Sequence, residues 1–222
     1  MLNFTKYKNC QGLKKEHDLI KEHYFCTMNF LAHLYLSGSN NDLRFGNFIA
    51  DAIRASQYTH YPQGIQEGIR LHRSIDSFTD AHPIFRQHCK LFFPQHSHYA
   101  RVILDVVYDH FLAQLWEEYH TTKLVDYAAD FYRITEENKA DLPDKMQRLF
   151  ELMKKQNWLV EYGSIKGLER ILYHMSKRTS FPSNFPAAIG VVEANKDQMV
   201  SEFKIFFSEL EKHCKNHIEL QA

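Results

Sequence analysis

The sequence has few of the residues that interrupt a chain, with only 8 glycines and 6 prolines among 222 residues. Turns depend on these two residue types, so their scarcity argues against a fold of many short strands and favours long helices. No segment alternates polar and apolar residues as a half-buried strand does. We therefore expect an all-α fold, a single-domain multi-helix bundle.

The chain also lacks a net charge, because 27 basic residues balance 27 acidic ones. Bulk charge therefore calls for neither nucleic acid nor an anionic membrane as a partner. No apolar run reaches the roughly 18 residues of a membrane helix, and the N-terminus has no signal-peptide core. The cysteines form no C-x-x-C pair and are expected to be free thiols: Cys10, Cys26, Cys89 and Cys214. These absences predict a cytoplasmic protein.

Residues 1–27 are polar, rich in Lys and His, and only weakly periodic. We expect them to form an N-terminal extension that is disordered or a single loose helix. A dense apolar texture begins at Met28, and the helical domain is expected to span residues 28–217. Within that domain, apolar spacing and proline positions predict helices over residues 41–56, 62–79, 98–119, 123–138, 143–156, 164–176 and 186–214, with another beginning at Pro83.

The most apolar of these segments, ILDVVYDHFLAQLW, contains Asp105 and Asp109. Their four-residue spacing places both on one helix face. Burying an unpaired carboxylate is costly, so each requires a strong partner, either a divalent cation or an arginine in a structural ion pair. His110 follows Asp109 directly and lies about 100° further round the helix.

A second segment carries His72 and Asp76 at the same four-residue spacing. Such a pair can hold one cation, or the Asp can orient the His ring. Arg73 lies beside them and could bind a phosphate oxygen. The alternative is a solvated charged face with ordinary pairing between successive turns.

Two further signals are weaker when taken alone. Asn47 and Asp51 share a helix face and could form a buried hydrogen bond, and His33 could be an ordinary core histidine. Together, however, imidazoles and carboxylates arise from four separate helices: His33, Asp51, His72, Asp76, Asp105, Asp109 and His110. Such a mixture suits Mn²⁺, Fe²⁺ or Zn²⁺, and a helical bundle with inward His and Asp residues can build such a site. The chemistry that it best matches is metal-assisted hydrolysis.

At these residues the sequence resembles the acyl-carrier-protein phosphodiesterase family, a divergent branch of the histidine–aspartate (HD) phosphohydrolases. The strings that carry the resemblance are MNFLAHLYL from Met28, GNFIAD from Gly46, GIRLHRSIDSFTDAHP from Gly68, ILDVVYDHFLAQLW from Ile103, NWLVEY from Asn157 and MSKR from Met175. The resemblance implies an HD-like fold with a metal site among the central helices, and Mn²⁺ as cofactor. It also implies hydrolysis of the phosphodiester between 4′-phosphopantetheine and the serine of holo acyl carrier protein, which gives the apo form.

These observations lead to a working assignment of roles. Metal ligands are expected to be Asp51, His72, Asp76 and Asp109. Catalytic roles are expected for His110, His33, Arg73 and Asp105. Basic residues near these helices are candidates for docking the acidic carrier protein: Arg54, Arg70, Arg86, Lys90 and Arg101.

Two other functions fit the same sequence. The first is an HD-type phosphohydrolase that acts on a nucleotide or another small phosphodiester, since a fold and a metal site do not fix the substrate. The second is a non-enzymatic helical module that binds carrier protein. That module would need no metal, and Asp105 and Asp109 would pair with arginines instead.

Overall fold

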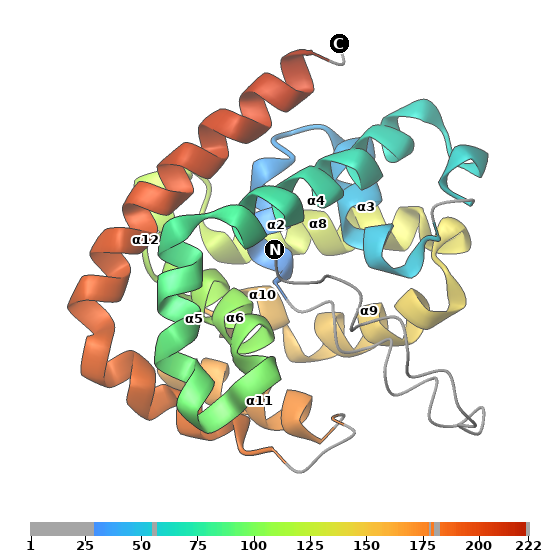
Figure 1. The fold of residues 1–222 in the computed structure, drawn as a ribbon. Helices are drawn as coiled ribbons and strands as arrows, with labels where there is room; N and C mark the ends of the chain where they lie inside the picture. Colours follow the sequence, from blue (N-terminus) through green and yellow to red (C-terminus); the bar gives the residue numbers. More distant parts are fainter. Residues whose placement is uncertain (1–28, 55–56, 178, 180–182, 221–222) are drawn as a thin grey trace, which may run out of the picture.

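The computed structural model of this protein describes residues 29–54, 57–177, 179 and 183–220. All regular secondary structure in this part of the chain is helical and forms one body, which confirms the expected all-α fold (Figure 1). The expected N-terminal extension, Cys10 and Cys26 lie outside the described residues, whereas Cys89 and Cys214 are free thiols as predicted. None of the described helices combines the length and hydropathy of a membrane span.

The helices follow the apolar stripes of the sequence. In chain order they are α2 (Phe30–Leu36), α3 (Asn41–Ile49), α4 (Gln63–Ala81), α5 (Pro83–His96), α6 (Ala100–Gln114), α7 (Trp116–Tyr119), α8 (Leu124–Glu137), α9 (Asp144–Gln156), α10 (Trp158–Glu161), α11 (Ile165–Ser176) and α12 (Ala188–Glu219). Short 3-10 turns lie between them: η2 (Ala50–Ala52), η3 (Tyr58–His60), η4 (Ser97–Tyr99), η5 (Lys139–Asp141) and η6 (Phe185–Ala187).

Three boundaries differ from the sequence-based expectation. The helix expected over residues 41–56 ends at Ile49, and a 3-10 turn carries the chain on to Ala52. The helix expected over residues 98–119 is divided at Leu115 into α6 and α7. The short helix α10 was not expected; it begins after Asn157, whose φ of 49° ends α9 in the left-handed region.

Helix α6 forms the centre of the core. Side chains around its whole circumference are completely buried: Ile103, Leu104, Val106, Val107, Phe111 and Leu112. Burial of each of these side chains contributes roughly 1.5–3 kcal/mol to the stability of the fold. Because α2, α5, α11 and α12 all pack against α6, polar residues on this helix lie inside the molecule, as its apolar sequence predicts.

Two glycines allow α3 and α4 to touch backbone to backbone. A Cβ atom on Gly46 would collide with the carbonyl oxygen of Ile65, and one on Gly68 would collide with the carbonyl oxygen of Leu43. The same added Cβ atom on Gly68 would lie only 2.9 Å from the backbone nitrogen of Asn47. This close approach brings the last turn of α3 against the middle of α4, where the site described below lies.

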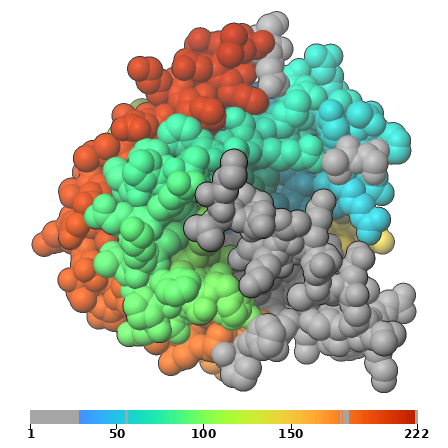
Figure 2. Space-filling model, in the orientation of Figure 1, coloured from blue at the N-terminus to red at the C-terminus, as the bar shows by residue number. Residues whose placement is uncertain are grey.

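The long helix α12 encloses one side of the molecule. Figure 2 shows it in orange and red along the edge of α4 and α5. Three polar contacts join it to these helices: His88 Nε2 to Glu202 at 2.7 Å, His82 Nε2 to Glu209 at 3.1 Å, and Ser74 Oγ to His213 Nε2 at 2.8 Å. They hold α4 and α5 in place from the outside.

Candidate metal centre

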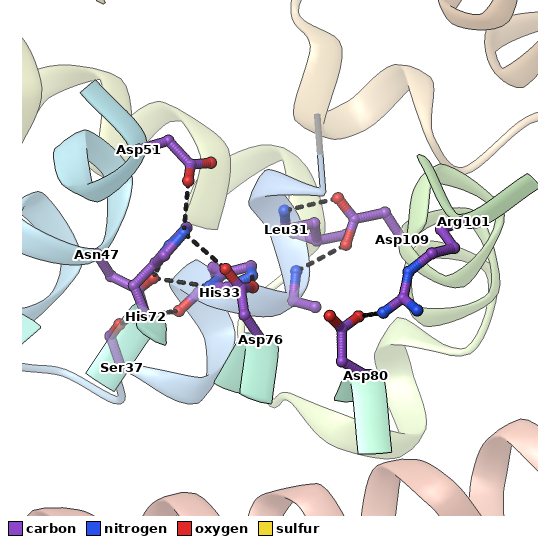
Figure 3. Close-up of polar contacts among 11 residues, drawn as sticks. Leu31, His33, Ser37, Asn47, Asp51, His72, Asp76, Asp80, Arg101 and Asp109 are labelled. Atoms are coloured by element: carbon purple, nitrogen blue, oxygen red, sulfur yellow. Dashed lines mark hydrogen bonds and ion pairs between the residues drawn. The ribbon is translucent and has the colours of Figure 1, made fainter. Parts of the chain in front are cut away.

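Three side chains from two helices converge beneath the surface of the bundle (Figure 3). His33 comes from α2, and His72 and Asp76 come from successive turns of α4. The Nε2 atom of His33 is 3.4 Å from one Asp76 oxygen, and the Nε2 atom of His72 is 3.3 Å from the other. Asp51, on η2, approaches His72 Nε2 at 3.2 Å. The two imidazoles are buried, whereas 49% of the Asp76 side chain is exposed, so the group opens to solvent on its carboxylate side.

The amide of Asn47 lies behind both rings. Its Oδ1 atom is 2.8 Å from Nδ1 of His33 and 2.9 Å from Nδ1 of His72. The sequence left open a hydrogen bond between Asn47 and Asp51, but the partners of Asn47 are His33, His72 and Ser37. Sequence reasoning therefore missed its contact with both histidines; the only signal was an amide at an apolar helix position.

The Nε2 atoms of His33 and His72 are buried and have no hydrogen-bond partner among the described residues. The carboxylate oxygens lie at 3.2–3.4 Å but not in line with the ring N–H directions. Donor atoms that share one cation at about 2.1 Å stand about 3.0 Å apart in octahedral and about 3.4 Å apart in tetrahedral geometry. The observed spacing and the orphaned nitrogens therefore fit a divalent cation placed between these groups.

The charges of this group are strongly coupled. Burial alone would lower the pKa of His72, but Asp51 and Asp76 outweigh it and raise that pKa to about 10. Burial alone would raise the pKa of Asp76, yet His33 and His72 hold it well below its usual range. The carboxylates are therefore stabilised by positive charge at the position where the two Nε2 atoms meet, which is also where a cation fits.

The structure does not bring Asp109, an expected metal ligand, into this group. Its two carboxylate oxygens accept backbone N–H groups at the start of α2, from Leu31 at 2.9 Å and from Ala32 at 2.8 Å. Figure 3 shows the carboxylate turned toward these amides. Burial raises the pKa of Asp109 to about 8, against the lowering effect of the two N–H donors. In the structure Asp109 therefore caps the helix that carries His33.

Asp105, one turn before Asp109, faces α4. Arg101, a further turn back, pairs with Asp80, which is one turn beyond Asp76 on α4 (Figure 3). Burial, and next the charge of Asp76, raise the pKa of Asp105 well above its usual range. The carboxyl group of Asp105 is therefore electrostatically coupled to the convergent group.

His110 and Arg73 lie outside the convergent group. His110 is buried, and its Nδ1 atom is 2.6 Å from the carbonyl oxygen of Tyr162, so it joins α6 to the end of α10. Burial also lowers its pKa. Arg73 is exposed on α4 and stacks on Tyr58 of η3, with its guanidinium carbon 5.3 Å from the ring centroid. Its position next to His72 keeps it near the open side of the group.

Comparisons with known proteins give a consistent result. A family model described as acyl carrier protein phosphodiesterase matches residues 28–210. Curated proteins of the same name are similar to this chain: one from Photorhabdus laumondii is 33% identical over 152 residues, covering 68% of this chain and 77% of its own. Another, from Klebsiella pneumoniae, is 29% identical over 193 residues, covering 85% of this chain and 98% of its own. No solved structure gives a significant match.

Proposed function

Because this chain belongs to the acyl carrier protein phosphodiesterase family, we propose that it hydrolyses the phosphodiester linking 4′-phosphopantetheine to the serine of holo acyl carrier protein. The products are apo acyl carrier protein and the released arm. One observation of the site supports this proposal above the others: the Nε2 atoms of His33 and His72 are buried, have no hydrogen-bond partner in the described part of the chain, and face the Asp76 carboxylate. Residues so arranged can hold the cation that phosphodiester hydrolysis commonly uses.

His33, His72, Asp76 and Asp51 are our proposed ligands, and Mn²⁺ is our proposed metal, because imidazole mixed with carboxylate suits it and the resemblance implies it. When bound, such a cation supplies a Lewis acid that neutralises a phosphoryl oxygen and lowers the pKa of water. In this assignment His33 changes from a catalytic residue to a ligand, and Asp109 changes from a ligand to the cap of α2.

Proton transfer is assigned to Asp105. Burial, and next the charge of Asp76, raise its pKa well above the usual range, which suits a group that donates a proton to the departing serine oxygen. Arg73, exposed beside His72, is suited to bind the substrate phosphate as it approaches the open side. His110 keeps a structural role, since its Nδ1 atom is bonded to Tyr162 and it lies away from the group.

Three of the expected basic docking residues already contact acidic groups or a backbone carbonyl, on their own helix or on a neighbouring one. Arg86 donates to the Asp80 carbonyl oxygen, Arg101 pairs with Asp80, and Arg70 lies 3.9 Å from Glu67. A docking surface built from them, like the cytoplasmic location, remains a prediction.

The decisive experiment is incubation of purified protein with holo acyl carrier protein and Mn²⁺, followed by mass spectrometry of both products. Asp76→Asn is expected to lower turnover at least about 100-fold, since it removes a ligand charge. The matched control is Asp80→Asn, one turn along α4, which should stay within a few-fold of the wild type. Wild-type turnover by Asp76→Asn, or hydrolysis of a nucleotide panel with holo carrier protein left intact, would contradict the proposal.

A further inference from the structure

Asn47 occupies a position that makes one side-chain oxygen common to both proposed imidazole ligands. It is 1% exposed, and its Oδ1 atom lies within 2.9 Å of Nδ1 on His33 and on His72. The two rings are stacked at a tilt, with centroids 4.3 Å apart. A single acceptor between two rings allows few arrangements of the imidazole protons. The other hydrogen bonds of the Asn47 amide leave only one of these arrangements possible.

The orientation of the Asn47 amide follows from its other neighbours. Its Nδ2 atom is 2.9 Å from the backbone carbonyl oxygen of His33, which can only accept a hydrogen bond. Nδ2 is also 3.0 Å from the Ser37 hydroxyl, which already donates its own proton to the His33 carbonyl at 2.8 Å. The NH₂ group must therefore face His33 O and Ser37, which leaves Oδ1 facing the rings.

The proton positions on the histidines follow in turn. An amide oxygen cannot donate, so both Nδ1 atoms must carry the protons that it accepts. A neutral imidazole with a proton on Nδ1 has its lone pair on Nε2. When a cation takes the place of any proton on Nε2, both lone pairs point at the space beside Asp76, where neither Nε2 atom has another partner among the described residues.

We propose that Asn47 is a positioning residue that fixes the same tautomer on His33 and His72, so that both imidazoles offer Nε2 to one cation. This inference rests on the proposed metal centre. Ser37 contributes by holding the amide in its orientation, and Gly46 and Gly68 contribute by bringing α3 close enough to α4 for the contact with His72. Asn47 acts only through the two histidines and does not itself reach the reacting atoms.

Two substitutions of nearly equal size separate this role from simple packing. Asn47→Leu removes both the acceptor and the donor. Asn47→Asp keeps an acceptor for the rings, replaces the donor to His33 O and Ser37 by a second oxygen, and adds a negative charge. Titration of each folded variant with Mn²⁺, followed by calorimetry, gives the affinity. We expect Asn47→Leu to lose roughly 10- to 100-fold in affinity and Asn47→Asp to stay within a few-fold of the wild type.

A second measurement needs no variant. Histidine ¹⁵N spectra of the wild-type chain loaded with Zn²⁺, a diamagnetic substitute, should show His33 and His72 with the proton on Nδ1 and the metal on Nε2. A proton on Nε2 of either ring would overturn the inference, as would wild-type affinity in Asn47→Leu or equal losses in both variants. Failure of the wild-type chain to bind either metal would instead remove the metal centre itself, and the inference with it.

Discussion

The Oδ2 atom of Asp109 accepts a hydrogen bond from the backbone N–H of Leu31 at 2.9 Å, which ties the central helix α6 to the first turn of α2. Its Oδ1 atom binds the next amide, that of Ala32, at 2.8 Å. Helix α2 has seven residues, too few to be stable alone. The position of His33, one residue further along, therefore depends on a carboxylate that lies outside the proposed metal centre.

Replacement of Asp109 by Ala should lower the free energy of unfolding by about 1–3 kcal/mol, because one buried and one partly buried N–H group lose their acceptor. Chemical denaturation, monitored by circular dichroism, measures this loss. Asp197→Asn, at an exposed position of α12, is the control and should change stability by less than about 0.5 kcal/mol. Complete loss of Mn²⁺ binding with unchanged stability would instead restore Asp109 as a ligand.

The contact between α3 and α4 makes a second prediction. Gly68→Ala places a methyl group on the Leu43 carbonyl oxygen, so the helices must separate. We expect a loss of about 1–3 kcal/mol in stability and weaker Mn²⁺ binding, since Asn47 and His72 move apart. The control is Gly190→Ala in α12, where nothing lies within 4 Å of the added Cβ; it should be neutral or stabilising by up to about 1 kcal/mol. Equal effects of the two substitutions would contradict this account.

The fold and part of the site were predictable because their signals are local. Apolar spacing indicates helices, and the His72–Asp76 pair lies four residues apart on one of them. The convergence of this pair with His33 was not visible in the spacing. It depends on α3, whose Asn47 contacts both histidines, and on the close approach of α3 to α4 that Gly46 and Gly68 allow.

Asp105 and Asp109 show more clearly what the sequence alone does not predict. Both are carboxylates on the same face of an apolar helix, and the sequence gives them the same pattern. In the structure, one faces α4 and the other caps α2. The difference arises because the backbone N–H groups of Leu31 and Ala32 lie opposite Asp109. These donors are more than seventy residues earlier in the sequence.

Metal binding should stabilise the protein measurably. A cation that binds only the folded state adds about 2.7 kcal/mol when its concentration is 100 times its Kd. Addition of Mn²⁺ to protein stripped with EDTA should therefore raise the Tm of the wild type by several degrees. His72→Gln should abolish most of this shift. His120→Gln, which changes a histidine on the far side of α2 from His33, should retain it; a shift retained by His72→Gln would argue against the site.

Acidification should destabilise the fold through its buried histidines. Burial lowers the pKa of His96 from its usual 6.5, so the folded chain binds fewer protons than the unfolded chain below that pH. The stability that His96 contributes is therefore present above pH 6.5 and is lost as the pH falls toward its folded pKa. The slope is at most about 1.4 kcal/mol per pH unit for one group.

Denaturation of wild type and His96→Gln at pH 7.5 and pH 5.5 tests this prediction. The stability difference between the two proteins should become smaller at the lower pH, because only the wild type loses the histidine contribution. His98→Gln, at an exposed neighbouring position, provides the comparison. A difference that is constant with pH would show that His96 titrates alike in both states.

The link between Asp109 and α2 also affects the order of events during synthesis. The two hydrogen bonds that anchor α2 close loops of 77 and 78 residues. While the ribosome is still translating α5, the early helices have emerged without the carboxylate that fixes their first turn. His33 can thus take up its final position only after α6 has been made, so the proposed metal ligands converge only then.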